Sequence, residues 1–447
     1  MSPVNTSKDL EIKINIEKYL KEWYEIKYNR DNFPFIPGHS HIPISSKVFD
    51  EEELIMLMES CLDFRLTSGK FTAQFEAALA RFLKVRHVLA VNSGSSANLL
   101  AVTALTSPTL GNKRLKPGDE VITLAASFPT TINPIIQNNL IPVFVDISVP
   151  DYNIDTSQLN KALSPRTKAI FSAHTMGNPF DISKISEFAG RNNLWLIEDC
   201  CDALGSKYSD KHVGTYSDIA TLSFYPAHHI TTGEGGAVIT NNSMLKKIIT
   251  SYRDWGRDCW CNSGHDNSCK RRFETQMGDL PCGYDHKYVF SHIGYNLKIT
   301  EMQAAIGIAQ IRKLSYFIEK RKNNFELLYK ALEPSRDSLI LPEKTPNSDP
   351  SWFGFLITIK ENAGFSRREL INRLEENKIA TRPLFAGNII KQPAYKQVKC
   401  KQVGELKNTD FVMNNAFWIG VHPGITEEMI SYMTDKINKF VEGKRSG

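Results

Sequence analysis

The sequence has no long apolar run. None of its stretches reaches the roughly 18 apolar residues that a helix needs to cross a bilayer. Residues 1–25 interleave acidic and basic side chains and have no central apolar block, which argues against a secretory signal. We therefore expect a cytoplasmic protein without a membrane-spanning segment.

The chain also has little charge of one sign. Its formal net charge is +5 over 447 residues, and no basic block with interleaved aromatic side chains stands out. Proteins that bind nucleic acids usually carry such a block or a strongly basic face. We expect no nucleic-acid partner.

Neither repeats nor low-complexity tracts occur, and from His87 onward short apolar runs alternate with helical stretches. Apolar strands separated by helices are typical of a largely parallel sheet that helices cover on both faces. The expected strands are His87–Val91, Glu120–Ala125, Pro142–Asp146, Lys168–His174, Leu194–Glu198, Ala220–Phe224 and Ala237–Thr240. The expected helices between them include Ala97–Leu105, Thr156–Leu163 and Ile182–Ala189.

Helices and a second α/β unit flank this block. The spacing of apolar residues predicts an amphipathic helix over Leu10–Trp23, followed by a Pro- and Gly-bearing connector at residues 32–45. The other expected elements are helices Asp50–Leu62 and Phe71–Leu83, a long helix over Gly294–Leu314 that continues through Arg321–Leu332, a loop over Ser335–Asp349, strand Trp352–Ile359, and helices Arg367–Asn377 and Glu427–Val441.

We divide the chain into three parts on this basis. Residues 1–49 form an N-terminal helix and connector, residues 50–315 a large domain, and residues 316–447 a small C-terminal domain.

A turn of small residues, Asn92–Asn98 (NSGSSAN), follows a predicted strand directly and opens a helix. At Gly94, Ser95 and Ser96, backbone N–H groups can close on a phosphate at the positive end of the helix. Such Gly-Ser turns are common before helices, so this motif alone is a weak signal.

The most specific pattern is Thr221–Gly236, TLSFYPAHHITTGEGG. With VNSGSSANLLA, IPVFVDI, IEDC and GYNLKITEMQAA, in that order along the chain, it resembles the DegT/DnrJ/EryC1/StrS family of sugar aminotransferases from about residue 50 to the C-terminus. The resemblance implies fold type I of the enzymes that use pyridoxal phosphate. That fold has a large, mostly parallel seven-stranded α/β/α domain and a smaller C-terminal α/β domain. The resemblance also implies pyridoxamine or pyridoxal 5′-phosphate as cofactor.

His228 stands where aminotransferases of this family carry the lysine that forms a Schiff base with the cofactor. An imidazole cannot form that imine, but it can move a proton near neutral pH. The resemblance therefore implies that His228 is a catalytic base. A structural histidine, or a relative that has lost its activity, is the alternative.

The resemblance also implies the other contacts. Asp199 would hold a proton on the pyridine nitrogen, which makes the ring an electron sink, although by itself it is also a plausible helix cap or turn residue. Phe128 would stack on the ring; without the resemblance it is a core aromatic. Asn296 resembles the asparagine that reaches the cofactor phosphate from the partner subunit, which implies a homodimer with shared sites. Gly94, Ser95, Ser96, Asp202 and Ser223 are further expected cofactor contacts, and Tyr225, Phe353 and Arg382 are expected around the substrate pocket.

Six of the eight cysteines lie between residues 200 and 282. In a reducing compartment such crowding indicates a metal or redox role before disulfides. Fifty-seven, one and seven residues separate Cys201, Cys259, Cys261 and Cys269. Four thiolates suit zinc or an iron–sulfur cluster, and the spacing fits neither paired zinc ligands nor the plant ferredoxin run. Chemistry alone leaves the metal open.

Within the family, this spacing resembles that of members that carry histidine for lysine and hold a 2Fe–2S cluster, here in an insertion around residues 255–285. The resemblance implies removal of the 3-hydroxyl from a nucleotide-linked 4-keto-6-deoxyhexose. The expected substrate is CDP-4-keto-6-deoxyglucose. The product would be a 3,6-dideoxy sugar for surface polysaccharide such as the O-antigen of lipopolysaccharide. An iron–sulfur flavoprotein reductase that uses NAD(P)H is the implied partner.

Three alternatives stay open: a dehydratase with histidine but no cluster, a zinc-stabilised relative, and a non-catalytic protein without the lysine. The presence of Asp199, Phe128 and the phosphate loop argues against the last one, because a scaffold has no use for an electron sink.

Overall fold

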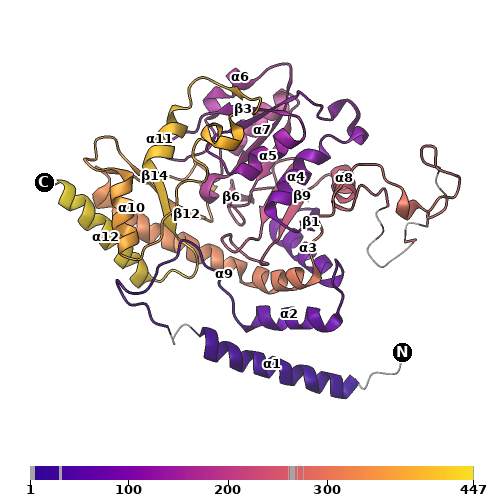
Figure 1. Cartoon of the computed structure of the whole chain (residues 1–447), viewed down its shortest axis with the longest axis horizontal. Helices are drawn as coiled ribbons and strands as arrows, with labels where there is room; N and C mark the ends of the chain where they lie inside the picture. Colours follow the sequence, from indigo (N-terminus) through magenta and orange to yellow (C-terminus); the bar gives the residue numbers. More distant parts are fainter. Residues whose placement is uncertain are drawn as a thin grey trace.

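A central sheet of eight strands organises the molecule (Figure 1). The computed structural model describes residues 6–29, 33–259, 261, 267–268, 270–274 and 276–445. In sheet order the strands are β1 (His87–Val91), β9 (Gly236–Thr240), β8 (Ile219–Ser223), β5 (Trp195–Asp199), β4 (Thr167–Ala173), β2 (Glu120–Leu124), β3 (Ile141–Val145) and β13 (Lys401–Gln402).

The sheet is mostly parallel, as predicted. Only β9 runs against its neighbours β1 and β8, and all other neighbours pair in parallel. All seven predicted strands are present within one residue of their expected ends. The eighth strand, β13, is two residues long and comes from the C-terminal part of the chain, so its apolar signal is too short to find in the sequence.

Helices cover both faces of the sheet because its side chains alternate between two apolar cores. Ile170, Leu196 and Leu222 face one core, and Phe171 and Ile197 face the other. The helices around the sheet are α3 (Lys70–Leu83), α4 (Gly94–Ala104), α5 (Pro129–Gln137), α6 (Leu159–Ala162), α7 (Ile182–Arg191) and α8 (Ser243–Arg253).

A 32-residue helix, α9 (Glu301–Leu332), joins the sheet to the C-terminal part of the chain. The expectation that this helix begins at Gly294 is wrong. Thr300 and Gln303 form a capping box that sets the first turn, and Lys298 pairs with Val91 of β1 instead. Leu314 and Ile318 belong to the sheet core and Phe325 to the C-terminal core, so α9 takes part in both. The division at residues 315 and 316 stays a prediction.

The C-terminal part holds a small antiparallel sheet of β10 (Leu339–Ile340), β12 (Gly354–Ile359) and β14 (Ala416–Gly420). Helices α10 (Arg367–Glu376) and α12 (Glu427–Arg445) pack there as expected, whereas β14 and α11 (Lys407–Asn415) were not predicted. A third, minor sheet contains β6 (Lys207–Tyr208), β7 (Lys211–His212) and β11 (Ser348–Asp349). Short 3-10 turns occur at Pro108–Lys113, Thr156–Gln158, Thr175–Gly177, His286–Tyr288, Glu333–Ser335, Ile389–Lys391 and Pro393–Tyr395.

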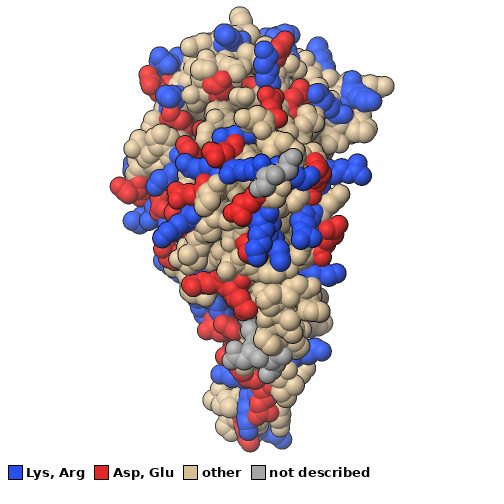
Figure 2. Space-filling model, turned by 90° about the vertical axis from the view of Figure 1, so that its left-hand side faces the viewer, with Lys and Arg blue, Asp and Glu red and all other residues tan. Residues whose placement is uncertain are grey.

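The N-terminal helix α1 (Thr6–Tyr28) lies beside α2 (Glu51–Asp63) at the edge of the molecule (Figure 1). Its apolar residues Leu10, Ile12 and Trp23 are exposed, so the amphipathic pattern predicts the helix without predicting a buried face. No helix within the described ranges is long and apolar enough to cross a membrane. On the face in Figure 2, basic and acidic side chains are interspersed.

Candidate active site

Asp199 lies at the carboxyl end of β5, where parallel strands place ligand sites in α/β proteins. Its side chain is buried. Oδ2 accepts hydrogen bonds from Asn98 Nδ2 at 2.9 Å and Thr131 Oγ1 at 2.7 Å, and Oδ1 accepts one from the backbone N–H of Cys201 at 3.1 Å. The described residues that directly follow Asp199 form no helix, so it is not a helix cap, although its bond to Cys201 is that of a turn residue. Three donors from three segments fix its carboxylate in one orientation.

The small-residue turn packs tightly against the end of β8. Helix α4 begins at Gly94, and its N-cap Ser93 accepts a hydrogen bond from the backbone N–H of Ser96 at 3.0 Å. A Cβ on Gly94 would lie 2.5 Å from Cβ of Ser223, so only glycine allows this approach. The structure therefore brings Gly94 next to Ser223, and Ser95 and Ser96 follow in the first turn of α4, at a helix end suited to an anion.

Two aromatic side chains border this region without being buried. Phe128, directly before α5, is 51% exposed, and Tyr225, just after β8, is 52% exposed. Phe128 touches Phe385 edge to face at 6.0 Å between ring centroids. The alternative interpretation of Phe128 as a core aromatic does not hold.

His228 is largely buried beside these groups. Its Nδ1 lies 3.4 Å from Oδ1 of Asp202 and makes no hydrogen bond, and its ring lies 5.2 Å from the ring of Phe353. Burial lowers the pKa of His228 to about 4; the charge of Arg321 acts in the same direction and that of Asp199 against it. Burial, and then the charge of Asp199, raises the pKa of Asp202. The imidazole is thus neutral near pH 7 and able to accept a proton.

Hydrogen bonds from buried groups hold the backbone and the neighbours of His228 in place. His229 is buried and its Nε2 lies 2.5 Å from the carbonyl oxygen of Ser351. Arg321, on α9, donates to the carbonyl oxygen of His228. Sequence reasoning missed Arg321, although its position carried a signal. It occupies the apolar stripe of α9 between Phe317 and Phe325, where a charged residue is unusual.

The predicted metal ligands are only partly brought together. Cys259 and Cys261 line one cavity of about 570 Å³, together with Trp255, Arg257 and Lys298 among others. Cys201 follows Asp199, and burial raises the pKa of its thiol. Cys269 lies outside the described residues. Within the described ranges, Cys201, Cys259 and Cys261 do not form a group whose ligand atoms lie within 4.8 Å of one another.

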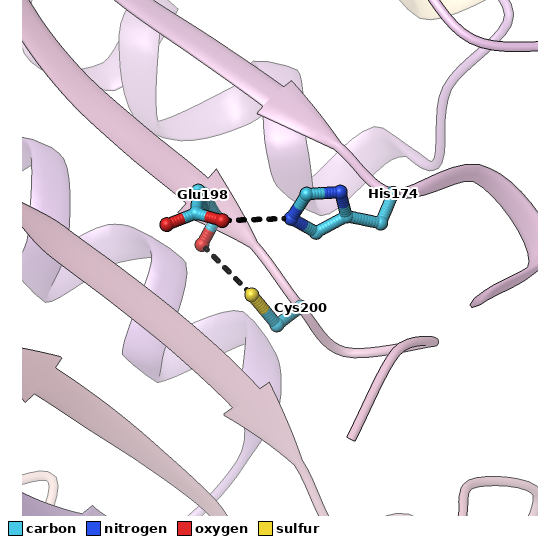
Figure 3. A group of neighbouring side chains, drawn as sticks. All are labelled: His174, Glu198 and Cys200. Atoms are coloured by element: carbon cyan, nitrogen blue, oxygen red, sulfur yellow. Dashed lines mark hydrogen bonds and ion pairs between the residues drawn. The ribbon is translucent and has the colours of Figure 1, made fainter. Parts of the chain in front are cut away.

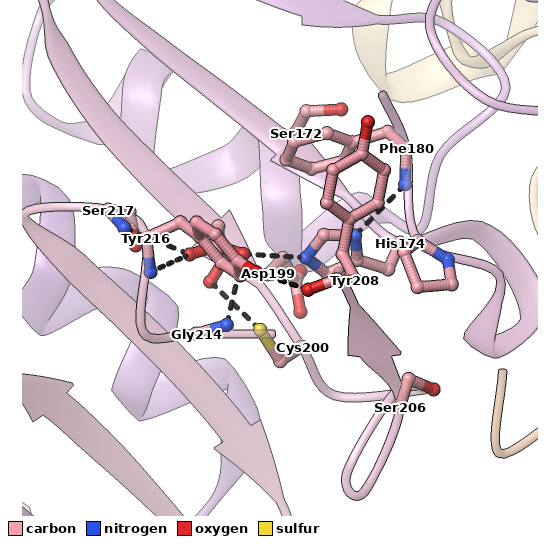
Figure 4. Close-up of polar contacts among 12 residues, drawn as sticks. Ser172, His174, Phe180, Asp199, Cys200, Ser206, Tyr208, Gly214, Tyr216 and Ser217 are labelled. Atoms are coloured by element: carbon pink, nitrogen blue, oxygen red, sulfur yellow. Dashed lines mark hydrogen bonds and ion pairs between the residues drawn. The ribbon is translucent and has the colours of Figure 1, made fainter. Parts of the chain in front are cut away.

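In the described part of the chain, one group of buried side chains has its possible metal-ligand atoms within 4.8 Å of one another. The group is His174, Glu198 and Cys200 (Figure 3). His174 Nδ1 accepts the backbone N–H of Phe180 at 3.2 Å, so its Nε2 must carry the hydrogen that points at Glu198 Oε2, 3.0 Å away. Glu198 also accepts the backbone N–H groups of Gly214, Tyr216 and Ser217 (Figure 4). These bonds outweigh the effect of burial and lower the pKa of Glu198. With its lone pairs used in this way, the group is a structural network and not a ligand set.

Comparison with known proteins identifies the family. The profile of the DegT/DnrJ/EryC1/StrS aminotransferase family matches residues 48–438. The chain belongs to this family. It is 58% identical over 407 residues to the lipopolysaccharide biosynthesis protein RfbH of Salmonella typhimurium (91% of this chain, 93% of the relative). It is 51% identical over 407 residues to the dTDP-4-dehydro-2,6-dideoxy-D-glucose 3-dehydratase of Saccharopolyspora spinosa (91% and 88%).

A solved structure has the same fold. The Escherichia coli GDP-4-keto-6-deoxy-D-mannose-3-dehydratase with bound hydrated PLP superposes with a TM-score of 0.80 at 29% identity, covering 89% of this chain and 100% of that one. The prediction of fold type I is confirmed, with β13 as an addition to the seven expected strands.

The residues around Asp199 fit the family's cofactor. The oriented carboxylate of Asp199, the close approach of Gly94 to Ser223 and the half-exposed ring of Phe128 suit the nitrogen, phosphate and face of a pyridoxamine phosphate ring. His228 Nδ1, buried and without a hydrogen bond, supplies a free polar atom at the same place.

Two further predicted residues, Asn296 and Arg382, make their own contacts. Asn296 accepts a hydrogen bond from Lys298 Nζ at 2.6 Å and pairs with Asp254, beside the cavity of Cys259. Arg382 is exposed and donates to the carbonyl oxygen of Thr381. In the family's shared-site arrangement, Asn296 would serve the partner subunit, and that role stays a prediction. Arg382 likewise stays a prediction.

Proposed function

We propose that the protein is a CDP-4-keto-6-deoxyglucose 3-dehydrase that uses pyridoxamine phosphate to remove the 3-hydroxyl of the sugar. The observation that carries this proposal is His228, which stands at the family's lysine position, is buried beside Phe353, and has its pKa lowered to about 4. A neutral base there can move protons but cannot hold the cofactor covalently. The names of two relatives, both 3-dehydratases of 4-keto deoxy sugars, support the same reaction.

The side chains divide the work between them. Pyridoxamine phosphate, when bound, supplies an amine for the 4-keto carbon and a ring that accepts electrons. Asp199 is oriented to keep a proton on the ring nitrogen, and Gly94, Ser95, Ser96 and Ser223 to hold the phosphate. His228 would take a proton at Nε2, since Nδ1 faces Asp202, from the cofactor carbon that bears the amine, and would pass it to the departing 3-hydroxyl, which leaves as water. The two electrons that then convert the dehydrated sugar to the 3-deoxy sugar would come from the reductase.

The apolar wall of the pocket serves this chemistry. Phe353 is buried against Trp418 at 5.2 Å between ring centroids, and the half-exposed Tyr225 lies three residues before His228. Apolar rings keep water from the base and hold its pKa low.

The proposal extends to a 2Fe–2S cluster on Cys201, Cys259, Cys261 and Cys269 and to an NAD(P)H-dependent iron–sulfur flavoprotein reductase. It also includes a homodimer with shared active sites and a cytoplasmic location. The end product would be a 3,6-dideoxyhexose of the O-antigen. The cysteine spacing and the shared cavity of Cys259 and Cys261 support the cluster. Among the described residues, Cys201, Cys259 and Cys261 do not meet as one ligand set. The name of the Salmonella typhimurium relative supports a role in lipopolysaccharide.

Metal analysis tests the cluster. Protein purified without oxygen should hold about two irons and two acid-labile sulfides per chain. Cys261→Ser should lose both, whereas Cys282→Ser, a substitution of an exposed cysteine outside the ligand set, should keep them. Zinc, or no metal, would overturn the cluster and leave the dehydratase without one.

Product analysis tests the reaction. With pyridoxamine phosphate and CDP-4-keto-6-deoxyglucose, wild-type protein plus a reductase should release the 3-deoxy sugar, detected by mass spectrometry. His228→Asn should abolish the product, and His41→Asn, at an exposed site, should not. Turnover without a reductase would favour the cluster-free dehydratase, and no binding of pyridoxamine phosphate would favour a non-catalytic relative.

A further inference from the structure

We propose that Arg321 is a positioning residue that fixes the His228 segment against the wall of the substrate pocket. The inference deepens the proposed function and rests on it, because it takes His228 as the base. Arg321 itself does not reach the reacting atoms; it acts through the backbone and the charge that it places behind the imidazole.

The guanidinium joins three segments that are distant in the sequence. Arg321 is 1% exposed and is among the largest fully buried side chains of the described residues. Its Nη2 donates to the carbonyl oxygen of His228 at 3.1 Å, and its Nη1 donates to those of Trp352 and Phe353, each at 3.2 Å. One rigid fork from α9 thus holds both the base and the pocket wall that packs on it.

This arrangement depends on the shape of the guanidinium. Its planar donors reach carbonyl groups in two directions at once, which a lysine ammonium on a flexible stem cannot reproduce. Loss of the donors leaves buried carbonyl oxygens without partners, and such groups are costly to bury. The ring of His228 and the ring of Phe353, 5.2 Å apart, would then no longer be held to a common anchor.

Arg321 also brings an unpaired positive charge to the site. Among the described residues no carboxylate lies within ion-pair distance of it, and Asp202 is the acidic group whose charge it feels. Burial lowers the pKa of Arg321 to about 10, so it stays protonated at neutral pH.

The charge of Arg321 opposes protonation of the base. The charged and titratable groups that act on His228 are Arg321 from α9, Asp199 from β5 and Asp202 at 3.4 Å, and His229 follows it in the chain. Asp199 favours an imidazolium and Arg321 disfavours it. Burial is the main cause of the lowered pKa of His228, and the guanidinium of Arg321 offsets part of the opposing effect of Asp199.

Two substitutions separate positioning from charge. Arg321→Lys keeps the charge and loses the fork, whereas Arg321→Gln loses both. Arg367→Lys is the matched control, because Arg367 also donates to two backbone carbonyls, those of Met413 and Ala416, but lies away from the site. Each variant is first checked by thermal melting and by its visible spectrum with pyridoxamine phosphate.

The readouts are kcat, KM and the pKa of His228. NMR of ¹³C-labelled histidine in the protein with bound pyridoxamine phosphate measures this pKa. Both Arg321 variants should lose about 10- to 100-fold in kcat with little change in KM, since a small displacement of a catalytic group has that effect. The pKa of His228 should stay low in Arg321→Lys and rise by about one pH unit in Arg321→Gln, without reaching its usual value because burial remains. Arg367→Lys should change neither.

An unchanged kcat and an unchanged His228 titration in folded Arg321→Gln would overturn the inference and leave Arg321 a purely structural residue. The titration needs no substrate. A wild-type protein without dehydratase activity would therefore refute the proposed function, whereas the NMR result would still decide the role of Arg321.

Discussion

At the scale of single residues, the site sets two carboxyl groups against one imidazole. Asp199 receives three hydrogen bonds that fix its carboxylate, whereas burial raises the pKa of Asp202, whose Oδ1 lies 3.4 Å from Nδ1 of His228. Burial also lowers the pKa of His228 to about 4. Groups whose environments push their pKa values apart take different roles in catalysis. The pair of Asp202 and His228 is therefore suited to handle the proton.

The lowered pKa of His228 predicts a pH dependence of stability. The pKa falls from 6.5 to about 4 on folding, so between these values the unfolded chain binds a proton that the folded chain refuses. Stability contributed by His228 is therefore complete above pH 6.5 and lost as pH falls toward 4, by at most about 3 kcal/mol. Urea unfolding of the cofactor-free protein at several pH values should show a shallower dependence for His228→Gln than for wild type. Parallel curves would contradict the assigned pKa.

Asp199→Asn should remove the electron sink without emptying the pocket. An amide cannot hold the ring nitrogen protonated, so kcat should fall by about 100- to 1,000-fold, in the range seen for loss of key electrostatic groups. The matched control is Asp218→Asn. Asp218 accepts the backbone N–H of Leu196 at 2.9 Å, near the opposite end of β5. Steady-state kinetics should separate the two, and equal losses would show that β5 as a whole, rather than Asp199, was disturbed.

At the scale of elements, the first turn of α9 anchors α3. The buried carboxylate of Glu301 accepts the backbone N–H groups of Gly69, Phe71 and Thr72 and the hydroxyl of Thr72, at 2.6–2.9 Å. A carboxylate at a helix N-terminus is favoured both by these donors and by the helix dipole.

Glu301→Gln should lower the free energy of unfolding by about 2–4 kcal/mol. The amide NH₂ of glutamine would replace one carboxylate oxygen and would face backbone N–H groups that need an acceptor. Glu319→Gln, at an exposed position of the same helix, should change it by less than about 0.5 kcal/mol. Urea unfolding measures both. Catalysis per folded molecule should be unchanged in each variant, and a fall in kcat for Glu301→Gln would mean that α3 shapes the site.

The same elements show what the sequence can and cannot predict. The seven main strands and Asp199 at a strand end follow from local apolar runs, which survive into the fold. The start of α9 depends on a capping box, whereas the apolar pattern continues on the N-terminal side of it. Strand β13 forms only because a segment distant in the sequence pairs with β3. Arg321 and the contact of Asp202 with His228 arise from tertiary packing. The spacing of four cysteines was visible in the sequence, but nothing local says which of them meet.

At the scale of the whole molecule, the predicted shared site calls for a second chain. His228 and Asp199 lie at the carboxyl ends of the sheet strands, whereas Asn296 lies with Lys298 beside the cavity of Cys259 and Cys261. A homodimer related by twofold symmetry would bring the Asn296 face of each chain to the His228 site of the other, if the shared-site prediction holds.

Complementation between two inactive variants tests this arrangement. His228→Asn disables the site of its own chain, and Asn296→Ala should disable the site of the partner. In a mixed dimer both defects then fall in one site and leave the other intact. Random pairing of co-expressed chains should recover about a quarter of wild-type activity, since half the dimers are mixed and each has one good site. Separately tagged chains allow the mixed dimer to be isolated and its kcat compared with the two parents. Recovery in the mixed dimer requires that His228 and Asn296 of one site come from different chains. If the two residues served the same chain, the mixed dimer would carry one defect in each site and stay inactive, and the placement of Asn296 at the cavity would then have to be explained without a partner.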